Sequence, residues 1–185
     1  KQLKKFIYKK ITIIPNFIDE SQALKFKNNF IRRGGEFKFV FVGSLTKRKK
    51  TLSLLKAILK LKSNYSIRLD IIGNGIEEKY LKDFVSINNL RGEVTFHGYL
   101  KNPFNIVSEA DLLVLPSASE GFARASLEAL CLGIPIILRD VDSNYELFEK
   151  PFSGSLFKYD YELPDIMIST ALLARKRSHK SSLLP

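Results

Sequence analysis

The chain has 185 residues, of which 45% are hydrophobic and 26% charged, and its 30 Lys and Arg outweigh its 19 Asp and Glu to give a formal net charge of +11. This composition suits one packed domain and excludes a disordered chain, and no apolar run reaches the roughly 18 residues that a membrane-spanning helix needs. The single cysteine, Cys131, excludes an internal disulfide and favours a reducing compartment. Since no signal-peptide pattern opens the chain, we expect a cytoplasmic location.

The first 36 residues are interpreted as an interdomain linker with a leading strand. A basic segment at residues 1–10 precedes an apolar stretch at residues 11–16, which predicts a short strand that stops at Pro15 and Asn16. Residues 22–33 are polar and predict irregular or helical structure.

From residue 37 onward, predicted strands alternate with predicted helices. Several of the strands are apolar on both faces, which indicates a parallel sheet covered on both sides. We therefore expect an α/β fold, a doubly wound Rossmann-like domain over residues 37–175, followed by a basic tail at residues 176–185. In such a sheet, ligands bind outside the carboxyl ends of the strands, where the strand order reverses. The predicted strands are residues 37–42, 67–72, 93–96, 111–115 and 135–138, and the predicted helices are residues 50–61, 77–87, 103–109, 122–132 and 143–148.

The most informative motif lies between the fourth strand and its helix, where Glu120 and Glu128 stand eight positions apart. This spacing is about two helical turns, so we expect both carboxylates to face one ligand. Between them, the backbone N–H groups of Gly121 and Phe122 at the helix N-terminus favour an anion. A ligand with both hydroxyls and phosphates, such as a nucleotide sugar, fits this arrangement. The alternative is a capping role for Glu120 and a solvated surface charge at Glu128.

A run of four cations, residues 47–50, follows Gly43 at the end of the first strand and precedes a helix. Cations at a helix N-terminus oppose the helix dipole, and a bound phosphate would offset that cost. The alternative interpretation of the run is a solvated charged face. Its spacing does not match a P-loop, which makes a Walker-type NTPase a poor fit.

The ends of the second and third strands add weaker signals. Gly73 and Gly75 predict a tight turn that allows close approach to a ligand, but the chain has Glu78 where a dinucleotide fingerprint needs another glycine. NAD binding is therefore disfavoured. Tyr99 or the adjacent backbone is expected to meet a base. His97 is expected to be structural, because no carboxylate, Ser or Cys partner is evident from the sequence.

Asp140 and Asp142 stand one residue apart and could share a divalent cation. No third ligand is evident, so we interpret them as part of a polar loop and predict no metal site.

The order and spacing of these motifs resemble the C-terminal, donor-binding domain of GT-B fold glycosyltransferases of the GT4 family. The resemblance runs from residue 11 to residue 157, most of the chain. The residues that carry it are Ile14-Pro15-Asn16, Gly43 with Lys49, Ile72-Gly73-Asn74-Gly75, Val94 to Gly98, Ala110-Asp111, Pro116-Ser117, Glu120-Gly121-Phe122 with Glu128-Ala129, and Gly133-Ile134-Pro135.

The resemblance assigns roles to individual residues of the long motif. Glu120 corresponds to the glutamate that faces the donor sugar, and Glu128 to the one that binds the ribose hydroxyls. The backbone of Gly121, Phe122 and Ala123 would bind sugar and phosphate. Ala123 stands where the family often has Gly or Pro.

The cation run also departs from the family pattern. Lys49 corresponds to the lysine that neutralises the diphosphate, but Ser44 stands where many members have a second phosphate-binding cation, an arginine. Arg48 or Lys47 could replace that arginine. Lys50 occupies the position of a glycine in the family.

The resemblance implies a retaining glycosyltransferase that moves a hexose or N-acetylhexosamine from a nucleotide diphosphate sugar to a glycan or lipid-linked acceptor in bacterial cell-surface polysaccharide synthesis. It implies no cofactor, a UDP-sugar ahead of a GDP-sugar as donor, and a missing N-terminal acceptor domain, so the isolated chain should be inactive.

The basic termini favour peripheral binding to the inner face of a membrane, because anionic lipids attract Lys and Arg. The alternatives are a nucleic-acid-binding module, disfavoured because no recognised motif is present, and a non-catalytic sugar-phosphate sensor.

Overall fold

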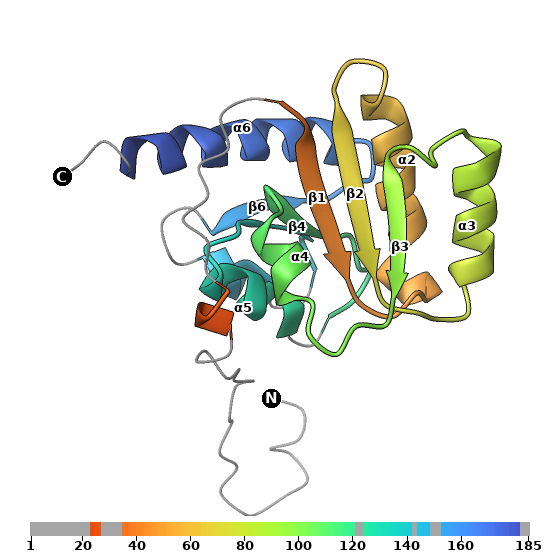
Figure 1. Ribbon diagram of the computed structural model, residues 1–185, viewed down its shortest axis with the longest axis horizontal. Coiled ribbons are helices and arrows are strands. Elements are labelled where there is room, and N and C mark those ends of the chain that lie inside the picture. The colour runs from red at the N-terminus through yellow and green to blue at the C-terminus, as the bar shows by residue number, and fades with distance from the viewer. Residues whose placement is uncertain (1–22, 27–34, 121–123, 142–143, 149–152, 182–185) are drawn as a thin grey trace, which may run out of the picture.

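The computed structural model describes residues 23–26, 35–120, 124–141, 144–148 and 153–181 of the chain (Figure 1). The predicted strand at residues 11–16 and most of the predicted linker up to residue 34 lie outside this described part. In the linker, Ala23 is buried, and the Phe26 ring lies 5.8 Å from the ring of Phe104.

A six-stranded sheet in the order β3-β2-β1-β4-β5-β6 forms the centre of the domain. Each neighbouring pair of its strands is parallel. This arrangement confirms the predicted α/β, Rossmann-like class, and β4 is buried along its whole length, as its apolar sequence predicts. The strands are β1 (Phe37–Val42), β2 (Ile67–Ile72), β3 (Val94–Gly98), β4 (Leu112–Leu115), β5 (Ile136–Arg139) and β6 (Gly154–Phe157).

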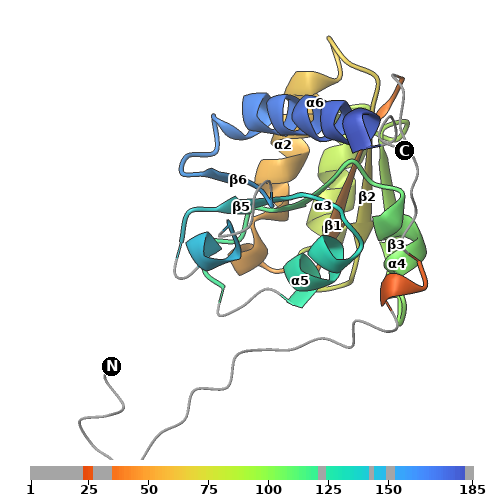
Figure 2. The same ribbon diagram turned by 90° about the vertical axis from the view of Figure 1, so that its left-hand side faces the viewer.

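Helices cover both faces of the sheet (Figures 1 and 2). On one face, α2 (Thr51–Leu61) contacts α3 (Glu78–Ile87) and α6 (Leu163–Ser181). On the other face, α4 (Phe104–Ser108) contacts α5 (Arg124–Cys131). Short 3₁₀ helices, η2 (Lys47–Lys49) and η3 (Asn144–Phe148), follow β1 and β5. None of the described helices is long and apolar enough to cross a membrane.

Up to residue 148, the observed elements agree with the sequence pattern to within one or two residues at each end. Helix α2 illustrates why, because its buried residues Leu54, Leu55, Ile58 and Leu61 recur at helical spacing. The segment predicted as a helix at residues 143–148 is the 3₁₀ helix η3 instead.

The sequence analysis missed β6 and α6. Strand β6 has only two large apolar residues, and its pairing with β5 defines it as a strand. Its first residue, Gly154, has φ +139, and a Cβ there would lie 1.7 Å from the carbonyl oxygen of Ile136, so this tight register needs glycine. Helix α6 continues to Ser181, beyond residue 175, where the sequence predicted a tail.

A buried ion pair fixes α6 to the amino ends of β1 and β4. Arg175 donates from Nε and Nη2 to the two carboxylate oxygens of Asp111 over 2.9 and 2.8 Å, and the two side chains are 11% and 3% exposed. The same guanidinium donates to the carbonyl oxygen of Glu36 over 2.7 Å and lies 4.1 Å from the centre of the Phe37 ring. Asp111 also accepts from the backbone N–H of Lys38 over 2.8 Å. The helix that sequence analysis overlooked is therefore part of the domain.

This anchor should control stability. Replacing Asp111 with alanine leaves Arg175 as a buried charge without its carboxylate, so we expect the free energy of unfolding to fall by about 3 kcal/mol or more. Glu109→Ala is the matched control, because Glu109 is exposed and lies 3.5 Å from Lys38 Nζ, and it should cost less than about 1 kcal/mol. Urea unfolding midpoints would measure both, and equal midpoints would contradict the anchoring role.

Candidate functional site

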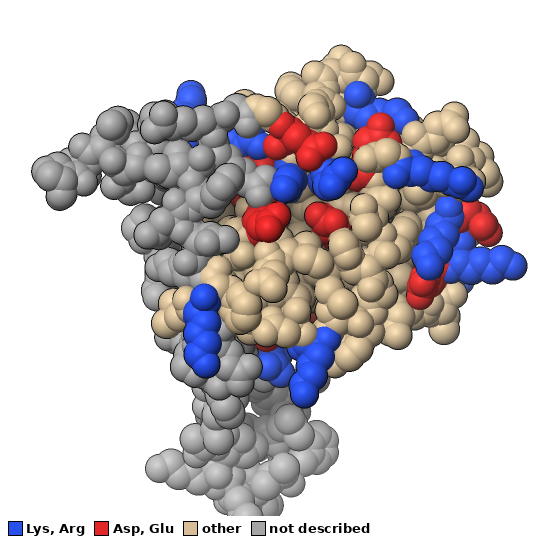
Figure 3. Space-filling view, viewed as in Figure 1, with Lys and Arg blue, Asp and Glu red and all other residues tan. Residues whose placement is uncertain are grey.

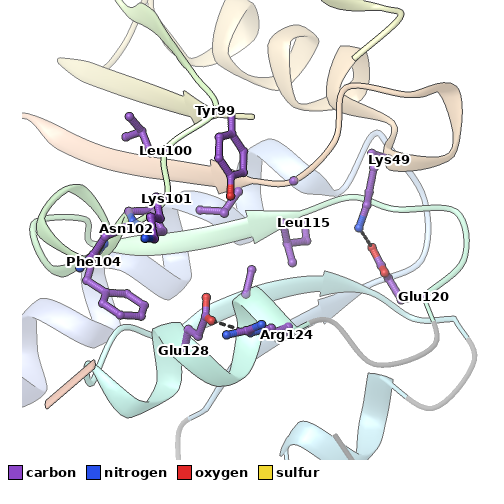
Figure 4. A pocket seen from close by; sticks show the side chains of 14 residues that line it. Lys49, Tyr99, Leu100, Lys101, Asn102, Phe104, Leu115, Glu120, Arg124 and Glu128 are labelled. Carbon is purple, nitrogen blue, oxygen red and sulfur yellow. Dashed lines mark hydrogen bonds and ion pairs between the residues drawn. The ribbon is translucent and has the colours of Figure 1, made fainter. Parts of the chain in front are cut away.

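The strand order reverses between β1 and β4, and a cavity of about 710 Å³ lies at their carboxyl ends. The reversal arises because β2 and β3 extend the sheet on one side of β1, whereas β4 to β6 extend it on the other. Figure 4 shows side chains from both halves of the sheet around the cavity. The lining residues are Val42, Gly43, Lys49, Tyr99, Leu100, Lys101, Asn102, Pro103, Phe104, Leu115, Glu120, Arg124, Ala125 and Glu128.

An ion pair between Lys49 and Glu120 lies at one end of the cavity (Figure 4). Lys49 Nζ lies 2.5 Å from Glu120 Oε1, and the two side chains are 13% and 7% exposed. Arg48 lies 3.6 Å from the other oxygen of Glu120 and donates to the carbonyl oxygen of Ser119 over 2.7 Å. The backbone N–H of Ala118 in turn donates to the carbonyl oxygen of Arg48 over 2.8 Å. The loop after β1 and the loop after β4 are thus tied together by side-chain and backbone contacts.

Glu128 lines the same cavity from α5, on the opposite side of Arg124 from the Lys49–Glu120 pair (Figure 4). Its Oε1 accepts a hydrogen bond from Arg124 Nε over 2.9 Å. Both motif glutamates therefore line one cavity. Glu120 reaches it from the loop after β4 and Glu128 from α5, and their expected role in binding one ligand stays a prediction.

The segment after β3 forms the remaining wall. Tyr99, predicted to meet a base, lines the cavity and is 72% exposed. Asn102 Oδ1 accepts from the backbone N–H of Phe104 over 3.0 Å, which fixes the start of α4 beside the cavity. Sequence analysis missed Lys101, Asn102, Phe104 and Arg124 as lining residues. Asn102 followed by Pro103 is a helix-start signal that could have drawn attention to this wall.

Four predicted donor-binding residues lie outside the lining: Ser44, Arg48, Gly73 and Gly75. A Cβ on Gly73 would lie 1.9 Å from the carbonyl oxygen of Gly43, and one on Gly75 would lie 2.3 Å from that of Leu45. These glycines allow two loops to pack closely, so the close approach they permit is to backbone of the chain itself. Gly121, Phe122 and Ala123 lie outside the described residues.

His97 has a carboxylate partner, contrary to the expectation from sequence. Its Nε2 lies 2.6 Å from Asp70 Oδ1, on the neighbouring strand β2. The sequence did not reveal the pair because the two residues are 27 positions apart and meet only through strand pairing. Neither residue lines the cavity, and the structural role expected of His97 stays a prediction.

Arg139 supports the loop after β4 from the other side. Its Nε donates to the carbonyl oxygen of Pro116 over 3.1 Å, and its Nη2 pairs with Asp160. Burial acts to raise the pKa of Asp160, but hydrogen bonds from Ser53 and Arg139 and the charges of Arg139 and Lys50 outweigh it and hold the pKa below its ordinary value. The contribution of this network to stability is therefore present above the ordinary pKa and is lost as pH falls through the folded value.

The predicted absence of a metal site remains a prediction. Asp140 follows β5, and its backbone N–H donates to the carbonyl oxygen of Phe157 over 2.8 Å, whereas Asp142 lies outside the described residues. Within the described ranges, no three His, Cys, Asp or Glu side chains lie close enough to hold a metal ion.

A comparison with protein families decides the identity of this domain. The family model described as Glycosyl transferases group 1 matches residues 22–162, which include the whole cavity. The chain belongs to this glycosyltransferase family.

Curated relatives of this glycosyltransferase domain include two bacterial enzymes. An O-antigen biosynthesis glycosyltransferase from Escherichia coli, WclY, is 33% identical over 93% of the chain. The Escherichia coli UDP-Gal:alpha-D-GlcNAc-diphosphoundecaprenol alpha-1,3-galactosyltransferase is 31% identical over 85% of the chain. The matches cover 48% and 42% of these two relatives, so the chain spans about half their length.

Solved structures with the same fold include two glycosyltransferase complexes. S. aureus TarM, in complex with UDP and alpha-GlcNAc-glycerol among its ligands, matches with a TM-score of 0.77 and 20% identity over 96% of this chain and 36% of that chain. Anabaena HepE in complex with UDP-glucose matches with a TM-score of 0.66 and 22% identity over 87% of this chain and 46% of that one. At this identity they establish the GT-B fold of the glycosyltransferase domain.

Lys50 stands where the resembling family has a glycine, and its backbone adopts the left-handed conformation that glycine favours. It has φ 54 and ψ 31 and lies between η2 and the first turn of α2. A left-handed residue with a Cβ costs roughly 1 to 2 kcal/mol, so Lys50 strains the backbone next to Lys49.

This strain predicts a difference between two substitutions that remove the same charge. Lys50→Gly should give a free energy of unfolding about 1 kcal/mol higher than Lys50→Ala, because glycine relieves the strain and alanine retains it. Thermal or urea unfolding of the pair, with nucleotide absent, would measure the difference. Equal stabilities would mean that position 50 relaxes without cost.

Proposed function

We propose that this chain is the donor-binding domain of a retaining glycosyltransferase that uses a nucleotide diphosphate sugar. The observation that carries the proposal is the placement of Lys49 with Glu120 and of Glu128 along one cavity at the reversal of strand order. Cations beside one carboxylate suit a diphosphate near the sugar, and a second carboxylate farther along suits ribose hydroxyls. Two solved structures with this fold hold UDP or UDP-glucose, which supports the ligand class.

The proposed chemistry begins with the leaving group. Cleavage of the anomeric bond places negative charge on the diphosphate oxygens, and a fixed cation lowers the barrier most where charge develops. Lys49 is held for this role because its side chain is mostly buried and Glu120 restrains its Nζ. Glu120 faces the donor sugar, and Glu128 accepts hydrogen bonds from the ribose. Lys49 and the carboxylates need no metal for these roles.

The donor sugar is proposed to be a hexose or N-acetylhexosamine carried by UDP, with a glycan or lipid-linked acceptor. A relative named as a UDP-Gal transferase acting on a diphosphoundecaprenol acceptor, together with O-antigen relatives, favours bacterial cell-surface polysaccharide synthesis. Since the chain spans about half of these relatives, a separate acceptor-binding half completes the proposed enzyme. A cytoplasmic location at the inner face of the membrane suits such an acceptor.

Two alternatives remain distinguishable by experiment. A sugar-phosphate sensor would bind the nucleotide sugar but leave it intact when the acceptor half is present. A nucleic-acid module would need a continuous basic surface, and the face seen in Figure 3 instead bears interspersed acidic and basic residues. Among the described residues, Arg68 pairs with Glu36 over 3.8 Å and Lys38 with Glu109 over 3.5 Å. We therefore favour the transferase.

The ribose contact predicts a loss of nucleotide affinity. The chain should bind UDP in the presence of EDTA, and Glu128→Ala should weaken that binding by about 1.5 to 3 kcal/mol, the scale of a hydrogen bond to a charged group. Isothermal calorimetry on the folded variants would measure it, with exposed Glu109→Ala as control. Unchanged affinity in Glu128→Ala would remove the ribose contact, and binding that needs magnesium would contradict the metal-free site.

Stabilisation of the leaving group predicts a loss of turnover. When the chain is joined to its acceptor-binding half, Lys49→Ala should lower kcat on the order of 10² to 10³-fold, the scale for loss of a group that stabilises developing charge. Lys47→Ala is the matched control, because Lys47 lies on the same 3₁₀ helix, is exposed, and lies outside the cavity lining. Steady-state rates decide the case: greater damage from Lys47→Ala would mean that the wrong lysine is assigned.

A further inference from the structure

The cations that line the described cavity are Lys49, Lys101 and Arg124. Lys47 and Arg48, the two candidates from sequence for a second phosphate-binding cation, do not line it. Arg48 also has another task, because it donates to the carbonyl oxygen of Ser119 and lies beside Glu120, which holds the loop after β4 in place.

Arg124 is held in the cavity with most of its hydrogen-bonding capacity unused. Its Nε donates to Glu128, whereas none of the described groups accepts from its two Nη nitrogens. The side chain is 72% exposed and extends from the start of α5 between Glu128 and the Lys49–Glu120 pair (Figure 4). A guanidinium fixed through Nε presents a planar pair of Nη donors, the geometry that matches two oxygens of a phosphate group.

A bound diphosphate would also need a second cation, because the lining carboxylates already offset part of the positive charge of the lining. Lys49 pairs with Glu120, and Arg124 pairs with Glu128, so each lining carboxylate already offsets one lining cation. A diphosphate brings further negative charge to the space between these two pairs. Lys101 belongs to the wall formed by the segment after β3, beside Asn102 and away from the Lys49–Glu120 end (Figure 4).

We propose that Arg124 binds the diphosphate of the donor as its second cation, while Glu128 holds the guanidinium in place through Nε. This role rests on the proposed function and deepens it. Because Glu128 contacts both Arg124 and the ribose, one carboxylate links recognition of the ribose to recognition of the phosphates. Arg124 therefore replaces the cation missing at Ser44 from the opposite wall of the cavity.

The test compares ligands that differ only in phosphate number. Calorimetry at constant ionic strength would measure the affinities of uridine, UMP and UDP, with guanosine, GMP and GDP in parallel, for the chain and for Arg124→Gln, Arg124→Lys, Arg48→Gln and Lys47→Gln. Arg124→Gln should weaken binding of the diphosphate on the order of 10- to 100-fold. It should weaken binding of the monophosphate less and binding of the nucleoside hardly at all. Arg124→Lys should recover part of the loss, since it keeps the charge without the planar fork. Arg48→Gln should change the affinities of the nucleoside, the monophosphate and the diphosphate by the same factor. Lys47→Gln should change none of these affinities.

Each outcome bears on the proposal. An Arg124→Gln loss that is the same for nucleoside and diphosphate would overturn it, because Arg124 would then act only on the ribose through Glu128. A loss that grows with phosphate number in Arg48→Gln or Lys47→Gln, but not in Arg124→Gln, would also overturn it and leave the proposed function standing. If the unmodified chain binds neither diphosphate, the proposed function and this inference both fail. Arg124 is exposed and its pair with Glu128 is an i,i+4 contact, so the variants should fold, which urea unfolding would verify.

Discussion

The site depends on the ion pair between Lys49 and Glu120, which joins two loops that are distant in sequence. The pair is 71 residues apart along the chain and 2.5 Å apart in space. It forms because β1 and β4 are neighbours at the point where the strand order reverses. Both side chains are largely withdrawn from water, which strengthens their attraction but also makes either one costly to leave alone. A ligand that brings negative charge to Lys49 can share this cation without leaving Glu120 isolated.

Backbone contacts and a second set of ion pairs hold those loops from behind. Gly73 and Gly75 let the loop after β2 pack against the loop after β1, at distances where a Cβ would collide with carbonyl oxygens. Arg139, at the end of β5, donates to the carbonyl oxygen of Pro116 and pairs with Asp160, which follows β6. These contacts support the loop that leads to Glu120. At the opposite end of the sheet, Arg175 and Asp111 fix α6 to β1 and β4. These contacts hold the loops that carry Lys49 and Glu120, which suits a role in positioning charge.

Two acid–base pairs lie along the cavity, and they are the groups that we propose as partners for a nucleotide sugar. The Lys49–Glu120 pair lies at one end and the Arg124–Glu128 pair lies farther along, with Tyr99 and Asn102 on the wall after β3 (Figure 4). Membership of the glycosyl transferases group 1 family agrees with this arrangement. In the family resemblance, the two glutamates and Lys49 match the pattern, whereas Ser44 stands where many members have an arginine. Lys50, a left-handed residue beside Lys49, is a departure of the same kind.

The sequence by itself determined the class of fold and the motif residues, because both depend on local chemistry. The apolar run of β4 and the buried face of α2 can be recognised from the spacing of apolar residues in the sequence. Glu120, Glu128 and Lys49 can be recognised because they belong to motifs of fixed order. Tertiary structure alone decided β6, which is a strand only by virtue of its register with β5, and the membership of α6, which Asp111 anchors through Arg175. It also decided which of several cations enter the cavity and paired His97 with Asp70. Those outcomes depend on the directions in which side chains leave strands and loops distant in sequence, and no local pattern encodes such directions.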